Sequence, residues 1–138
     1  MVNLQEVIIM ARNNTISATF SQASGDGASG YTESSGSKSF TSGDSVKIEG
    51  TISHSGATVY LASDYGLAQC DGIYLENRDS TNFITCVLKD ASDNVLSTLK
   101  IAPEGVFMVR LDADMTAVAK VSLIADTAPC EFVLCVSE

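Results

Sequence analysis

Apolar and polar residues alternate along much of this chain. Residues 15–20 read Thr-Ile-Ser-Ala-Thr-Phe and residues 46–52 read Val-Lys-Ile-Glu-Gly-Thr-Ile, with a small or apolar residue at every second position. Successive side chains of a β-strand point to opposite faces, so this period predicts half-buried strands. Similar apolar stretches predict further strands over residues 57–61, 72–77, 83–88, 95–101, 106–111, 117–124 and 131–136.

Turn signals separate these segments. The sequence Ala102-Pro103-Glu104-Gly105 has Pro at the second position and Gly at the fourth, which predicts a type I turn. Other connections are rich in Asp, Asn, Ser and Gly: residues 54–56, 78–82, 89–94, 112–115 and 125–129. Short strands separated by such turns, without a long helix, predict an all-β protein: an antiparallel β-sandwich with jelly-roll-like connectivity.

The first 40 residues are less regular. Residues 1–12 are ambiguous, because Asn3 and Glu6 fit a helix N-terminus whereas Val7-Ile8-Ile9 favours a strand, the interpretation we prefer. Residues 21–37 hold four Gly and six Ser, which predicts a long flexible loop.

This loop contains one bulky apolar side chain, Tyr31, and Phe40 follows just beyond it. A segment so rich in Gly and Ser cannot recover its ordering entropy by packing on its own domain. We therefore predict a docking arm that becomes ordered against a partner, with Tyr31 as its anchor and Phe40 seated beside it. The alternative is a tolerated insertion, because loop length adds little to the cost of closure.

Length and composition are those of one globular domain, residues 1–138. Hydrophobic residues make up 45 % of the chain, enough for a core without disulfides or a metal. The net charge is −9, and the eight basic residues are scattered, which argues against direct nucleic-acid binding. The N-terminus lacks the basic start of a signal peptide, and no apolar run reaches the ~20 residues of a membrane helix, so we expect cytoplasmic synthesis and no membrane association.

The four cysteines are expected to be reduced and unreactive thiols. Cytosolic synthesis disfavours disulfides. Cys86 lies between Ile84 and Leu88 at the spacing of an inward strand position, so it should be the most protected. Cys130 and Cys135 would fall on opposite faces of one strand, and Cys70 completes the set. Neither a Cys-x-x-Cys spacing nor a Cys/His cluster is present, so no zinc site is expected.

Catalytic and cofactor motifs are missing. His54 is the single histidine and sits beside a turn glycine, where an exposed turn residue is expected. Residues 25–30 match Gly-x-Gly-x-x-Gly inside a Ser-rich tract, without the strand and helix that a dinucleotide site needs. Asp90 with Asp93, and Asp112 with Asp114, are explained by turn chemistry. We therefore predict no enzyme, metal or cofactor.

A carbohydrate-binding module is the alternative class. Such modules stack sugars on exposed aromatic side chains, whereas this chain has no Trp, and its four Tyr are scattered.

The second half of the chain resembles small structural proteins of tailed-bacteriophage virions. Residues 72–84 (GIYLENRDSTNFI) are similar to a family string with Asn-x-Asp-x-Thr-Asn-aromatic at its centre. Residues 98–111 (TLKIAPEGVFMVRL) are similar to a strand, a Pro-Gly-Glu turn and a second strand, although Glu104 and Gly105 stand here in swapped order. The closing hairpin, up to residue 136, extends the resemblance over residues 72–136, and the resemblance does not place residues 1–70.

The resemblance implies a non-enzymatic virion component made in the host cytoplasm. Members of this group serve as capsid decoration or cement proteins, or as neck and tail fittings, so the expected partners are the major capsid protein or neck and tail proteins. It brings no catalytic residues. Because virion components occupy symmetric positions, we also expect a homo-oligomer, a trimer or a higher ring.

Overall fold

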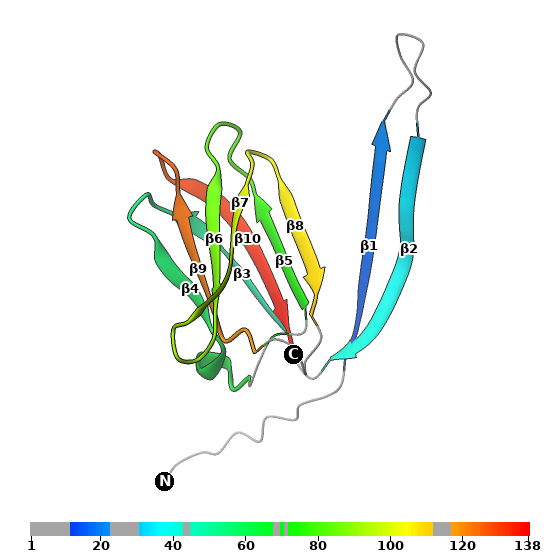
Figure 1. Cartoon of the computed structure of the whole chain (residues 1–138), viewed down its shortest axis with the longest axis horizontal. Coiled ribbons are helices and arrows are strands. Elements are labelled where there is room, and N and C mark those ends of the chain that lie inside the picture. Colours follow the sequence, from blue (N-terminus) through cyan, green and yellow to red (C-terminus); the bar gives the residue numbers. More distant parts are fainter. Residues whose placement is uncertain (1–11, 23–30, 43–44, 68–69, 71, 112–116) are drawn as a thin grey trace. The chain divides into compact units, whose positions relative to one another are not determined.

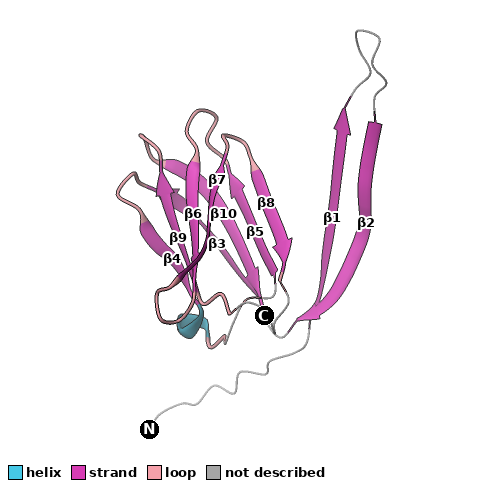
Figure 2. Ribbon diagram, in the orientation of Figure 1, coloured by secondary structure: helices cyan, strands magenta, loops and turns pink. Residues whose placement is uncertain are grey.

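The computed structural model describes residues 12–22, 31–42, 45–67, 70, 72–111 and 117–138. The chain divides into two compact units, Met1–Ser42 and Gly43–Glu138. Every regular element in the described residues is a β-strand, apart from one 3-10 turn at Ala62–Tyr65 (η1), which confirms the predicted all-β class (Figures 1 and 2). None of the described helical residues forms a segment long and apolar enough to cross a membrane.

The first unit contains an antiparallel hairpin of β1 (Arg12–Gln22) and β2 (Tyr31–Ser42). The strand predicted at residues 15–20 is confirmed, whereas the predicted loop over residues 21–37 is too long. Residues 21–22 belong to β1 and residues 31–37 to β2, because pairing between the strands satisfies backbone groups that a loop would leave to water. Residues 23–30, and residues 1–11 of the ambiguous N-terminal segment, lie outside the described residues.

The second unit is a sandwich of two four-stranded antiparallel sheets. One sheet has the order β3-β10-β5-β8, built from Ser45–Ile52, Cys130–Ser137, Gly72–Asn77 and Val106–Arg110. The other has the order β4-β9-β6-β7, built from Ala57–Leu61, Lys120–Ala125, Ile84–Lys89 and Val95–Ile101. The predicted antiparallel sandwich is thus confirmed, but within Gly43–Glu138, whereas the sequence predicts a single sandwich domain over residues 1–138.

The core lies between the two sheets and follows the two-residue period. In β6, Ile84, Cys86 and Leu88 are buried while the residues between them are partly exposed. Leu75 of β5 and Leu134 of β10 are completely buried on the opposite side of the same core. Burial of large aliphatic side chains contributes about 1.5–3 kcal/mol each, so this layer supplies most of the stability of the sandwich.

The strand order also fixes the chain path. Consecutive strands β3 and β4 lie in different sheets, and so do β4 and β5, β5 and β6, β7 and β8, β8 and β9, and β9 and β10. Each sheet therefore combines strands from early and late in the sandwich sequence, and the jelly-roll-like detail of the connectivity stays a prediction. Strands β3 and β8 form the edges of one sheet, and β4 and β7 those of the other.

The turn between β7 and β8 differs from the predicted type I. The amide of Gly105 donates to the carbonyl of Ala102 (N···O 2.9 Å), and Glu104 has a φ of 56°. A positive φ at the third position defines a type II turn, where Gly is the usual residue. A residue with a side chain does not fit at position 105, because a Cβ there would lie 2.8 Å from the Ala102 carbonyl oxygen.

Candidate functional site

The two predicted docking residues both lie in β2. Tyr31 is in register with Gln22 of β1, and Phe40 is in register with Asn14. The prediction that Phe40 seats beside Tyr31 is wrong, because the two residues are nine positions apart in one strand with a single irregularity, a Cα separation of roughly 25–30 Å. Both remain on one arm and occupy register positions opposite even-numbered residues of β1, the set that includes Ile16 and Phe20.

The odd-numbered positions of β1 have a different character. Thr15, Ser17, Thr19 and Ser21 are exposed hydroxyl residues. The Thr19 hydroxyl donates to the Ser34 hydroxyl on β2 (O···O 3.3 Å). Residues 32–36 of β2 are exposed as well. The odd-numbered set of β1 thus presents hydroxyl residues to water, whereas the exposed residues of β2 occur in both register sets, since Glu33 is in register with Phe20.

A charged network crosses the outer face of the β3-β10-β5-β8 sheet. Lys47 pairs with Glu49 on β3 (N···O 2.8 Å). Arg78, just beyond β5, lies 3.3 Å from Glu76 and 3.8 Å from Glu49. The Tyr74 hydroxyl donates to Glu76 (3.2 Å).

Strand β10 runs between β3 and β5, so this network spans it. Val133 of β10 pairs with Glu49 on one side and Glu76 on the other, and it is only 3 % exposed although it does not belong to the core cluster. The long side chains beside it therefore shield an apolar residue from water on the outer face.

The network also shifts proton affinities. A hydrogen bond and the charge of Lys47 lower the pKa of Glu49, and the same contact raises the pKa of Lys47. Burial and the neighbouring Glu76 raise the pKa of Tyr74. All three groups therefore keep their ordinary charge at neutral pH, which suits ion pairing and offers no group poised for proton transfer.

A shallow, open depression adjoins this network. Its lining residues are Glu49, Gly50, Thr51, Arg78, Glu131 and Phe132. Sites for small substrates are usually enclosed and largely apolar. This depression is open and rimmed by charged groups, so it fits a polar protein surface better than an enclosed substrate.

Residues 77–82 have a structural role. Asn77 is completely buried, and its Nδ2 donates to the carbonyls of Asn82 (2.8 Å), Ala102 (3.0 Å) and Ile101 (3.2 Å). Its Oδ1 accepts from the amide of Asp79 (3.0 Å). Asn77 thereby ties the β5–β6 loop to the β7–β8 turn. Sequence reasoning missed this role, although an Asn at the inward register of β5 was a usable signal.

Asp79 organises the same loop. Its Oδ1 accepts from the amides of Thr81 (2.8 Å) and Asn82. These hydrogen bonds to the charged form lower the pKa of Asp79. The contacts of Asn77 and Asp79 therefore hold this loop in shape.

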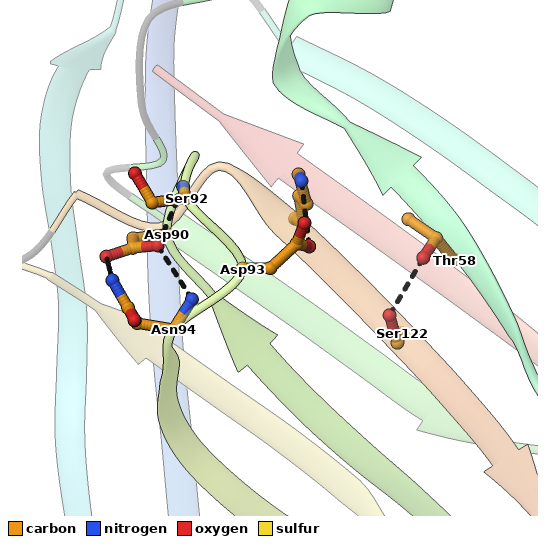
Figure 3. A network of polar contacts seen from close by, with 7 residues as sticks. Thr58, Asp90, Ser92, Asp93, Asn94 and Ser122 are labelled. Carbon is orange, nitrogen blue, oxygen red and sulfur yellow. Dashed lines mark hydrogen bonds and ion pairs between the residues drawn. The ribbon is translucent and has the colours of Figure 1, made fainter.

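In the β6–β7 loop the prediction of turn chemistry is confirmed for Asp90, whereas the side chain of Asp93 contacts a distant lysine (Figure 3). Asp90 accepts from the amides of Ser92 (2.8 Å) and Asn94 (2.9 Å) and from the Asn94 side chain (2.8 Å). Asp93 has a φ of 68° and pairs with Lys120 (2.8 Å). The Asn94 side chain, followed by backbone donors, lowers the pKa of Asp90, and Lys120 lowers that of Asp93.

Thr58 and Ser122 hydrogen-bond across the neighbouring β4–β9 pair (3.0 Å), a further polar contact on the outer surface (Figure 3). The described residues contain no group of three or more His, Cys, Asp or Glu side chains that could hold a metal ion. Asp112 and Asp114, and the glycine string at residues 25–30, lie outside the described residues.

His54 is an exposed turn residue, as predicted. The amide of Gly56 donates to the carbonyl of Ser53 (3.1 Å) and closes the turn. A Cβ at Gly56 would lie 2.7 Å from Ile124, which explains the glycine.

The described tyrosines of the sandwich do not form a sugar-binding platform. Tyr65 is 44 % exposed and stacks on Tyr60, which is buried (ring centroids 5.6 Å apart). Tyr74 is partly buried and hydrogen-bonded to Glu76. An exposed row of aromatic rings is therefore not found within the described part of the sandwich.

None of the four cysteines forms a disulfide. Cys70, Cys86 and Cys130 are completely buried, whereas Cys135 is partly exposed on the opposite face of β10 from Cys130, as predicted. Burial raises the pKa of Cys86 to about 12. We expect Cys135 to be alkylated first and Cys86 last, which mass spectrometry of timed labelling in the native protein would check. Fast labelling of Cys86 would contradict its burial.

Comparison with known proteins gives little further information. Neither a protein-family model nor a curated protein matches the chain. A solved chain from Bacillus endospore appendages, described as a family of disulfide-linked pili, aligns with 68 % of this chain and 85 % of its own length. The identity is 19 % and the TM-score 0.37, a level of similarity that carries no inference about function.

Proposed function

We propose that this protein is a non-enzymatic structural component of a tailed-phage virion, a capsid decoration or cement protein or else a neck or tail fitting. The observation that carries the proposal is the β1-β2 hairpin, which forms a unit of its own outside the sandwich. An isolated two-stranded hairpin is at best marginally stable in water. An arm of this kind is stabilised when it packs on another surface, here a neighbouring virion protein.

Two further features support this role. The charged groups described in the sandwich engage in loop and surface contacts, and the pKa shifts of Glu49, Asp79, Asp90 and Asp93 keep these carboxylates ionised. The net charge of −9 disfavours packaged DNA as a direct partner and suits the outside of a particle. The resemblance over residues 72–136 selects the virion among the assemblies to which such a subunit could belong.

Immunogold labelling of purified virions tests the assignment. Negative-stain images should show the label at repeated positions on the head, neck or tail. A particle preparation that lacks the protein would refute the proposal, and selective binding to a glycan array would favour the carbohydrate-binding module instead.

A variant of the arm tests the attachment. Replacing Tyr31 and Phe40 with Ser should reduce the amount of protein on the particle severalfold without changing the melting temperature of the sandwich. Thr32→Ala is the matched control, because Thr32 lies in the same strand and is exposed. Equal loss for the control and the double variant would contradict a specific role of Tyr31 and Phe40.

A further inference from the structure

Strand β8 differs from the other three edge strands of the sandwich. An edge strand presents unpaired backbone groups that can pair with another chain, and proteins blunt such edges with bulges, charges or Pro. The register of β4 is interrupted between Thr58 and Tyr60, and that of β7 opposite Leu88 and Lys89. Strand β3 carries charged Lys47 and Glu49.

Strand β8 has no register shift and no Pro, and it has one charged residue where β3 has two. Its sequence is Val-Phe-Met-Val-Arg, and its ladder with β5 continues without a shift from Val106 to Arg110. Its charged residue, Arg110, stands at the end of the strand. Among the described strands β8 pairs only with β5, and it is an edge strand of its sheet (Figure 1).

The side chains of β8 are incompletely covered. Val106 is 57 % exposed, the largest value but one among the described large apolar residues. Phe107 and Val109 occupy inward register positions opposite Leu75 and Ile73, yet they are only partly buried. A further strand beside β8 would extend the sheet and complete the burial of this edge of the core.

We propose that β8 pairs with β8 of a second copy of this chain, antiparallel and about a two-fold axis at Met108. Among the described edge strands of the sandwich, β8 is the one that is mostly apolar and has an uninterrupted ladder. The matching edge on a second copy is therefore β8 itself. Pairing of identical edges about a two-fold axis closes the interaction, whereas pairing with a different strand would continue into a filament. The β3-β10-β5-β8 sheets of the two copies thereby become one continuous eight-stranded sheet.

The self-paired register is chemically compatible. With Met108 on the axis, Phe107 lies opposite Val109 of the second copy, and Val106 lies opposite Arg110. Like charges directly opposite one another destabilise a ladder, and this register contains none. Because each copy carries a net charge of −9, salt should strengthen the contact by screening repulsion, in contrast to an interface made of ion pairs.

Sedimentation velocity of the full chain at micromolar concentrations tests this pairing. We expect a monomer–dimer equilibrium that shifts toward the dimer as the salt concentration rises. Met108→Lys places two like charges together on the axis and should weaken dimerisation roughly fivefold or more. Thr98→Lys is the matched control, because Thr98 is an exposed outward residue of edge strand β7, and this variant should dimerise normally.

A crosslink gives a second measurement that does not depend on loss of binding. In a Cys135→Ser background, Met108→Cys should form an intermolecular disulfide under mild oxidation, and Thr98→Cys should not. A monomer at all concentrations without this intermolecular disulfide, an oligomer insensitive to Met108→Lys, or open-ended filaments would each overturn the proposal. These outcomes are independent of virion labelling, so either proposal can fail without the other.

Discussion

The hairpin and the sandwich share the two-residue alternation, and in the sandwich a second sheet packs over one face of the strands. In β1, the described residues Thr15, Ser17, Thr19 and Ser21 are exposed hydroxyl residues. In β6, the alternate residues Ile84, Cys86 and Leu88 are at most 4 % exposed, because a second sheet covers that face. Alternation assigns residues to faces, but burial needs a second layer, which the sandwich supplies with its second sheet; the described residues of the hairpin unit form two strands.

This contrast predicts where the chain is sensitive to mutation. Substitutions at Asn77 and in the β7–β8 turn should change the free energy of unfolding by up to about 3 kcal/mol. Removal of the hairpin unit should leave the sandwich almost unaffected.

The largest effect is expected for Asn77→Ala. The substitution leaves three buried or partly buried carbonyls without the Asn77 donor, so the free energy of unfolding should fall by about 3 kcal/mol or more. Urea denaturation monitored by circular dichroism would measure it. Asn94→Ala, in an exposed turn, is the control and should change stability by less than about 1 kcal/mol. An equal loss of unfolding free energy for Asn77→Ala and Asn94→Ala would contradict the importance of the buried hydrogen bonds of Asn77.

The β7–β8 turn gives a pair of opposite effects. Gly105→Ala should lower the free energy of unfolding by about 2 kcal/mol, because its Cβ would lie 2.8 Å from a backbone oxygen. Glu104→Gly should raise it by about 0.5–1 kcal/mol, because Gly adopts the positive φ without strain. Thermal unfolding of both variants would check the signs. Stabilisation by Gly105→Ala would contradict the type II turn.

Acid should weaken the loops of the sandwich. The pKa values of Asp79, Asp90 and Asp93 are lowered in the folded protein from an ordinary 3.8. Such groups stabilise the folded state fully above their unfolded pKa, and this stabilisation is lost as the pH falls through the lower folded values. Thermal unfolding should therefore show a constant melting temperature from pH 7 to about pH 5 and a decline below about pH 4.

A matched variant separates the loop contribution from general acid unfolding. Asp90→Asn should be less stable at neutral pH and should show a shallower decline in acid. An unchanged pH profile would argue against Asp90 as one of the responsible groups.

The smallest effect is expected for deletion of residues 1–42. The sandwich core consists of residues from Gly43–Glu138, so the shortened protein should unfold cooperatively within about 1 kcal/mol of the intact chain, a few °C in melting temperature. Differential scanning calorimetry would measure this. A large loss of stability would show that the hairpin contributes to the folding of the sandwich.

Local sequence determined much of this protein: the all-β class, most strand positions in the sandwich, the inward position of Cys86 and the aspartate-rich turns. These features depend on a period of two and on hydrogen bonds between residues close in sequence, such as those of Asp90 with Ser92 and Asn94. Such interactions join residues a few positions apart, so a short stretch of sequence is enough to predict them.

Tertiary structure decided the remainder. The Ser-rich residues 31–37 became a strand because β1 pairs with them, and the pairing overrides their weak propensity. Asn77 connects the β5–β6 loop with the β7–β8 turn because that turn, some 25 residues away in sequence, lies within hydrogen-bonding distance of its side chain. The exposed edge of β8 and the charged cover over Val133 likewise depend on which strands are neighbours in the sheet. Local propensity does not encode that order, since it follows from burying both sheets against one another.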